Sequence, residues 1–161
     1  MRLPPAASFA AALLALTPAV APAPAPAQVI EECGWVGSPA NIVEPWQAHS
    51  RTYANGAIRI ALLDTEEPVC CAAHLLVLSP SGQDEGPGYR QCHVVSDRDG
   101  GLGFNLIDFD AIASSYDPAL GLRLDVPFWR YTDGRDRGRP GALALRINQA
   151  SGAVTLEPAA P

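Results

Sequence analysis

The apolar run Cys70–Pro80, CCAAHLLVLSP, constrains the fold more strongly than any other stretch that follows residue 27. About eight apolar residues bounded by turn-forming residues are typical of a central strand covered on both faces, and they are too few for an ordinary capped helix. We therefore expect a buried central strand over Ala72–Leu78.

Short segments with apolar residues at every second position surround this run. The dipeptide Asn55-Gly56 favours the tight turn of a hairpin, so Ser50–Ala54 should pair with Ala57–Leu63, and Ile58, Ile60 and Leu62 should face the core. Further strands are expected at Tyr89–Ser96, Leu102–Ile107, Leu122–Trp129, Leu143–Ile147 and Val154–Leu156.

Two local features modify this pattern. Pro127 has no backbone N–H, which predicts an edge strand or a bulge at that position. Asp108 is a suitable cap for a short helix over Phe109–Ser114. The sequence thus predicts a mostly β fold, a small antiparallel sandwich or barrel of about seven or eight short strands with one short helix near residues 108–115.

The first 27 residues have the three parts of a secretory signal peptide. Arg2 supplies the positive start, residues 8–20 form a short apolar stretch, and Ala25 and Ala27 form a small-x-small cleavage pattern. A retained membrane anchor is the alternative, because an Ala/Pro repeat follows the apolar stretch. We expect cleavage, no stable membrane span afterwards, and a periplasmic or secreted protein.

The remaining chain is expected to form one domain with flexible ends. Residues 28–49 contain many turn formers and predict an irregular N-terminal arm, residues 50–157 a single antiparallel β domain, and residues 158–161 a disordered tail. The chain has no lysine and is rich in Ala, Gly and Pro, which is typical of a GC-rich bacterial gene.

The charge is acidic, with a formal net value of −6 for the whole chain. Removal of Arg2 with the signal peptide makes this −7. A negative surface repels phosphate backbones, so we expect no nucleic-acid partner. A basic protein is the partner that such a surface favours.

The four cysteines of an exported chain are expected to be oxidised. A Cys33–Cys92 disulfide, which would attach the arm to the sheet, is the preferred pairing. Neighbouring Cα atoms lie closer than the usual disulfide span, so Cys70 and Cys71 should remain thiols or form a strained, reducible bridge. Two crossed bridges that use all four cysteines are the alternative.

The candidate metal ligands are Cys70, Cys71, His74 and His93, whose atoms suit zinc or copper. Their spacing is unfavourable, because on a strand Cys70 and His74 would lie about 13 Å apart at 3.3 Å per residue. A calcium loop is not expected, because its spacing is not matched by Asp97, Asp99, Asn105 and Asp108. These residues are typical of ordinary turns. We therefore expect neither a metal nor another cofactor.

No motif specifies a reaction. A thiol nucleophile would need a nearby base, and no serine lies in a G-x-S-x-G elbow. We accordingly expect no enzyme but a small exported protein with a non-catalytic binding or structural role, and with no identified ligand. The alternatives are an inhibitor of a basic extracellular enzyme, using loops 79–88 and 132–141, or a periplasmic metal or redox protein using Cys70, Cys71 and His74.

The tryptophans are the candidate contact residues. Trp35 and Trp46 are expected to cover the edge of the core as hydrophobic plugs. The alternative is an exposed aromatic contact surface formed by Trp35, Trp46 and Trp129.

Overall fold

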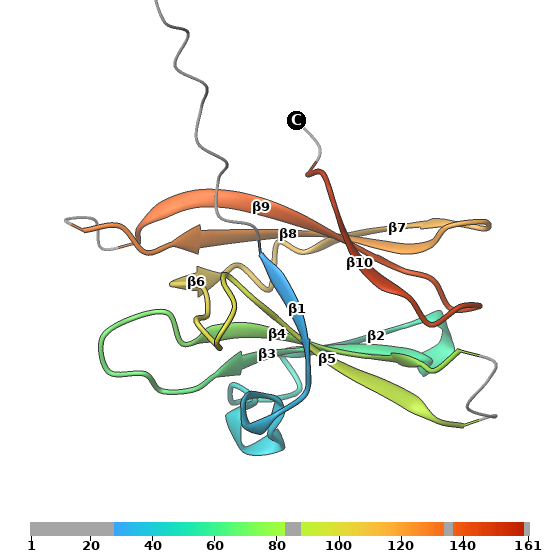
Figure 1. The fold of residues 1–161 in the computed structure, drawn as a ribbon, viewed down its shortest axis with the longest axis horizontal. Helices are drawn as coiled ribbons and strands as arrows, with labels where there is room; N and C mark the ends of the chain where they lie inside the picture. The colour runs from blue at the N-terminus through green and yellow to red at the C-terminus, as the bar shows by residue number, and fades with distance from the viewer. Residues whose placement is uncertain (1–27, 83–87, 134–136, 160–161) are drawn as a thin grey trace, which may run out of the picture.

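The alternating apolar residues form two antiparallel sheets of five strands, which pack face to face as a sandwich (Figure 1). The structure is a computed structural model that describes residues 28–82, 88–133 and 137–159. The expected signal peptide, parts of loops 79–88 and 132–141, and the end of the C-terminal tail lie outside the described residues.

The strand order of each sheet follows from its backbone pairing. The first sheet has the order β1 (Val29–Glu32), β5 (Arg90–Ser96), β4 (Ala73–Pro80), β3 (Ile58–Asp64) and β2 (Ser50–Tyr53). The second has the order β10 (Val154–Glu157), β9 (Arg139–Ile147), β8 (Gly121–Arg130) and β6 (Leu106–Ile107), and β7 (Ala113–Asp117) also pairs with β8.

Strand β4 is the central strand of the first sheet, as the apolar run predicts. Leu75 and Val77 face the core between the sheets, whereas Leu76 faces the outer side. The N-terminal arm covers that outer side and buries Val36 against Leu76 and Val94. Both faces of β4 are therefore buried, which explains why this strand lacks alternating polar residues.

The predicted hairpin between β2 and β3 forms, but Tyr53 and Ile58 are its closing pair, so Ala54 and Ala57 lie in the turn and not in the strands. Asn55 and Gly56 both have positive φ angles, 56° and 85°, a conformation that few other residue types adopt easily. Ile58, Ile60 and Leu62 contribute to the core as expected.

The predicted short helix near residues 108–115 is wrong. Ala113–Asp117 is strand β7, and its five residues pair with β8. Asp108 does accept a hydrogen bond from the Ala111 backbone N–H, at 3.2 Å, but it caps only a turn. Six residues form few helical hydrogen bonds, and the exposed edge of β8 offers the same backbone a full ladder.

Two smaller expectations also change. The arm is not irregular throughout, since its first residues form β1 on the edge of β5. Pro127 lies inside the second sheet, opposite Ala142 of β9, and not on an edge strand or in a bulge. On its other side β8 pairs with β6 up to Phe128 and with β7 from Asp125, so Pro127 falls in the gap between these partners.

The two long sides of the sandwich differ. On one side β1 contacts β10, and Ile30, Val154 and Leu156 close the core. On the other side the free edges of β2 and β7 face each other without pairing. Arg51 of β2 bridges part of this gap, donating hydrogen bonds to the backbone oxygens of Asp110 and Ile112, both at 3.2 Å.

A buried ion pair joins the sheets near the C-terminal end of β8. Asp97, which follows β5, is only 2% exposed. The Arg130 Nε atom lies 2.7 and 2.9 Å from the two carboxylate oxygens of Asp97.

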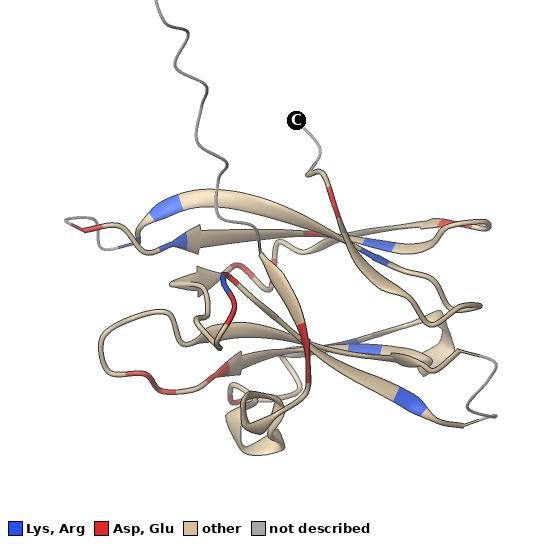
Figure 2. Cartoon of the chain, in the orientation of Figure 1, with Lys and Arg blue, Asp and Glu red and all other residues tan. Residues whose placement is uncertain are grey.

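Other acidic and basic residues lie along the strands and loops of both sheets (Figure 2). Within the described ranges, no helix is long and apolar enough to cross a membrane.

Candidate functional site

The sulfur atoms are not available for chemistry as thiols. The predicted Cys33–Cys92 disulfide is confirmed and attaches the arm to β5. Cys70 and Cys71 are bonded to each other, so the alternatives of free thiols and of crossed bridges are wrong. Their Cα atoms are 3.7 Å apart. Cys71 has a φ angle of 72°, so its backbone does not have the extended conformation of a strand.

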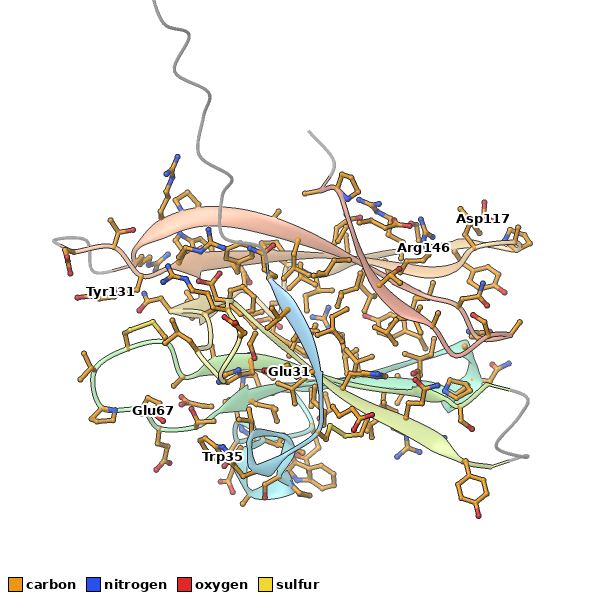
Figure 3. The ribbon with its side chains drawn as sticks, in the orientation of Figure 1. Glu31, Trp35, Glu67, Asp117, Tyr131 and Arg146 are labelled. Atoms are coloured by element: carbon orange, nitrogen blue, oxygen red, sulfur yellow. A yellow bond between two sulfur atoms is a disulfide. The ribbon has the colours of Figure 1, made fainter. Side chains whose placement is uncertain are left out.

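The candidate metal ligands do not converge. His93 pairs in register with Val77 and so lies on the inner face of the first sheet, whereas His74 lies on its outer face. Cys70 and Cys71 precede β4, beyond the exposed loop that carries Glu67 (Figure 3). In the part of the chain that the structure describes, no three His, Cys, Asp or Glu side chains are grouped as a metal site requires.

His74 is fully buried under the loop that follows β5. Its Nδ1 atom lies 2.9 Å from the Ser96 Oγ atom, and its Nε2 atom has no hydrogen-bond partner among the described residues. A Cβ atom on Gly103 would lie 2.8 Å from Nε2, so only glycine fits there. Burial lowers the pKa of His74 to about 4, and the Asp64 charge opposes this only in part.

This burial predicts a loss of stability on mild acidification. The pKa of His74 is 6.5 when exposed and about 4 in the fold, so between these values the unfolded chain binds more protons. The free energy of unfolding should therefore fall as the pH drops from about 6.5 to 4, by roughly 3 kcal/mol in total. Urea unfolding measured along this pH range tests the expectation.

His74→Gln is the informative variant, and its readout is the slope with pH. The slope should be clearly shallower than in the parent protein, while His93→Gln should change it less. Burial also lowers the pKa of His93, which leaves a residual slope of the same sign. An unchanged slope in His74→Gln would contradict the assignment.

The tryptophans of the arm are exposed rather than buried plugs. Trp35 and Trp46 are 66% and 59% exposed, and both lie on the arm that covers the outer face of the first sheet. Figure 3 shows Trp35 at this side of the sandwich. Trp129 lies in β8 of the other sheet, where it alternates with the core residue Phe128. A contact surface that uses Trp129 would thus be separate from one that uses Trp35 and Trp46, and either remains a prediction.

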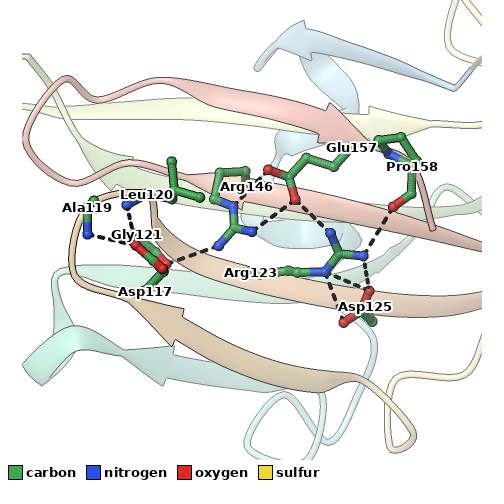
Figure 4. A network of polar contacts seen from close by, with 9 residues as sticks. All are labelled: Asp117, Ala119, Leu120, Gly121, Arg123, Asp125, Arg146, Glu157 and Pro158. Atoms are coloured by element: carbon green, nitrogen blue, oxygen red, sulfur yellow. Dashed lines mark hydrogen bonds and ion pairs between the residues drawn. The ribbon is translucent and has the colours of Figure 1, made fainter. Parts of the chain in front are cut away.

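A network of charges on the second sheet is satisfied internally (Figure 4). Glu157 accepts hydrogen bonds from Arg146 and Arg123, and Arg123 also binds Asp125. The hydrogen bonds from Arg146, followed by those from Arg123, hold the pKa of Glu157 below its usual value. Backbone N–H groups of Leu120 and Ala119 likewise lower the pKa of Asp117. These groups bind one another across β8, β9 and β10 and leave little charge for a ligand.

A polar hollow of about 510 Å³ lies at the edge formed by β1 and β5. It is lined by Glu32, Arg90, His93 and the Cys33–Cys92 bridge, with Gln91 between them. Glu32 lies opposite His93 in the register, and burial lowers the pKa of the imidazole. Among the described residues that line the hollow, none carries a hydroxyl group or free thiol that this imidazole would activate.

The open side of the sandwich contains a cleft of about 510 Å³. Its walls come from the end of β2 with the following turn and from β7, and its floor from the start of β8 and the turn after β9. The lining residues are Tyr53, Ala54, Asn55, Ser114, Ser115, Tyr116, Leu122 and Gln149. None of them is charged, although charged residues make up 17% of the chain.

The chemistry of the cleft is that of a neutral hydrogen-bonding site. Tyr53 packs against the core, whereas Tyr116 on the facing wall is 61% exposed. The Gln149 Nε2 atom is buried and has no hydrogen-bond partner among the described residues. A buried amide normally finds a partner, because leaving it unsatisfied costs about 1–3 kcal/mol.

Comparison of the chain with protein-family models, with curated proteins and with solved structures found no match. The cleft must therefore be interpreted from its own residues. Sequence reasoning did not find it, because its walls come from segments far apart in the chain. From the sequence, Asn55 is predicted only as a turn residue, and Ser114 lies in the predicted helix that does not form.

Proposed function

We propose that this protein is an exported, non-catalytic binding domain whose ligand lies in the cleft between β2 and β7. The carrying observation is the composition of that cleft, which is lined by two tyrosines and neutral polar side chains, including Gln149, whose buried Nε2 atom has no partner among the described residues. Concave sites with a few placed polar groups and aromatic walls are typical of ligand binding, and the volume lies in the usual range.

A binding role is favoured over catalysis by the same lining. Among the described residues that line the cleft there is no carboxylate, imidazole or thiol that would act as a base for Ser114 or Ser115. The ligand should be uncharged where it contacts the walls, because a charged group there would lose its hydration without an ionic partner.

The extracytoplasmic location rests on two features. The chain starts with the expected signal peptide, and two disulfides leave none of the described cysteines free. Disulfides persist in oxidising compartments such as the periplasm and the extracellular space. The alternative of an enzyme inhibitor depends on loops that lie partly outside the described residues.

Nuclear magnetic resonance with a library of neutral fragments tests the proposal. The library contains monosaccharides and disaccharides, N-acetyl amides and capped dipeptides. Fragments that bind should shift the backbone amide signals of the cleft residues. The largest shift is expected for the side-chain amide signal of Gln149. Tyr116→Ala should weaken this binding at least fivefold.

Tyr89→Ala is the matched control, because Tyr89 is 68% exposed and does not line the cleft. It should leave fragment binding unchanged. Fragments that shift signals elsewhere and leave the cleft unaffected would refute the assignment of the site.

A further inference from the structure

Strand β7 forms a free sheet edge beside the cleft. Among the strands that the structure describes, it pairs only with β8, through all five of its residues from Ala113 to Asp117. In an antiparallel ladder every second residue directs its N–H and C=O groups to one neighbour, and the others direct theirs away. On the side of β7 that faces away from β8, these groups have no backbone partner among the described residues.

This edge lacks the features that normally prevent strand addition. Natural edge strands are protected by charged side chains, proline, bulges or a covering segment. Strand β7 has the sequence ASSYD, with its only charge at the last residue, and all five side chains are exposed. By contrast, the edges of β1 and β10 lie beside each other, and β6 has only two residues.

The facing edge of β2 defines the space for an added strand. Arg51 contacts Ile112 just before β7 begins, and Tyr53 faces the cleft further along. From the contact between Arg51 and Ile112, β2 and β7 therefore run in the same direction into the cleft. An extended segment seated there would lie along β7, with alternate side chains directed between Tyr53 and Tyr116.

We infer that the ligand of this cleft is an extended polypeptide segment that adds as a strand to the free edge of β7. This inference rests on the proposed function and names the class of its ligand. The unpaired backbone groups of β7 supply hydrogen bonds that do not depend on sequence, and the cleft selects side chains. Because the lining is neutral, the selected side chains are uncharged and small enough to fit between the two tyrosines.

Gln149 fits the same ligand. Its buried Nε2 atom is a donor without an acceptor among the described residues, and a peptide carbonyl is the acceptor that an extended backbone presents at regular intervals. The segment would belong to a partner protein outside the cytoplasm, where the exported chain is expected to act.

A phage-displayed library of random nonapeptides is the first probe. Selection against the disulfide-bonded protein should give peptides with uncharged side chains at alternate positions. A synthetic copy of a selected peptide should slow hydrogen exchange of the amides from Ala113 to Asp117 at least tenfold. Failure to select any peptide, or protection confined to other strands, would overturn the inference.

Two exposed positions provide matched variants. Ser115→Lys places a charge in the middle of the edge and should weaken the selected peptide at least tenfold. Ala119→Lys adds the same charge in the adjacent turn, off the edge, and should change the affinity less than twofold. Equal binding by both variants would overturn the inference.

Modification of the peptide tests the mechanism without changing the protein. Methylation of backbone nitrogens at alternate residues removes donors from one side of the strand only. One of the two alternating sets should weaken binding at least tenfold and the other less than threefold. Equal effects of the two sets would show that the peptide does not bind as an added strand.

These outcomes separate the two proposals. Saccharide fragments that shift the cleft signals, without any peptide protecting β7, would leave the binding site in place and refute the peptide ligand. If neither fragments nor peptides affect the cleft, both proposals fail.

Discussion

Replacing Cys33 and Cys92 with serine should lower the free energy of unfolding by about 4 kcal/mol under oxidising conditions. The two residues are 59 positions apart, so their bond restricts a large part of the unfolded chain. It also holds the arm that buries Val36 over the outer face of the first sheet. Urea unfolding of the double variant, with the parent protein as reference, measures the difference.

The other disulfide supplies a matched control. Cys70 and Cys71 are adjacent, so their bond restricts almost no loop of the unfolded chain. The double variant Cys70→Ser/Cys71→Ser should therefore lose much less stability than the variant without Cys33 and Cys92. An equal loss in both would refute the account based on loop length.

Replacing Arg130 with methionine should destabilise the protein by about 3 kcal/mol, at the lower end of the range for a broken buried ion pair. The variant leaves the Asp97 carboxylate buried between the sheets without its bidentate partner. Arg98, whose Nε atom lies 3.7 Å from the same carboxylate, compensates in part. Thermal and urea unfolding both report this change.

A double-mutant cycle distinguishes pairing from packing. Asp97→Leu/Arg130→Met removes both charges, so it should be more stable than Arg130→Met alone. A double variant that loses the sum of the two single effects would show that the groups act independently. Fragment binding should persist in the double variant, because the pair lies at the end of β8 and the cleft at its start.

Alternating apolar residues determined the antiparallel β class, the continuous apolar run determined the central position of β4, and the Asn55-Gly56 dipeptide determined the hairpin. These features depend on side-chain periodicity and on local backbone preferences, which a sequence carries directly. The Cys33–Cys92 bond was predictable as a link between the arm and a strand of the sheet, whereas the Cys70–Cys71 bond forms although geometry disfavours a bond between adjacent cysteines.

Only the tertiary structure decided the features that bear on function. Residues 113–117 form a strand because the edge of β8 lies beside them, although their local sequence permits a short helix. His74 and His93 are separated by the sheet between them, and the cleft brings together Tyr53, Tyr116 and Gln149 from distant segments. Sequence periodicity fixes which face of a strand is buried, but it carries no information about which strands become neighbours across the sandwich, and that pairing creates the free edges and the site between them.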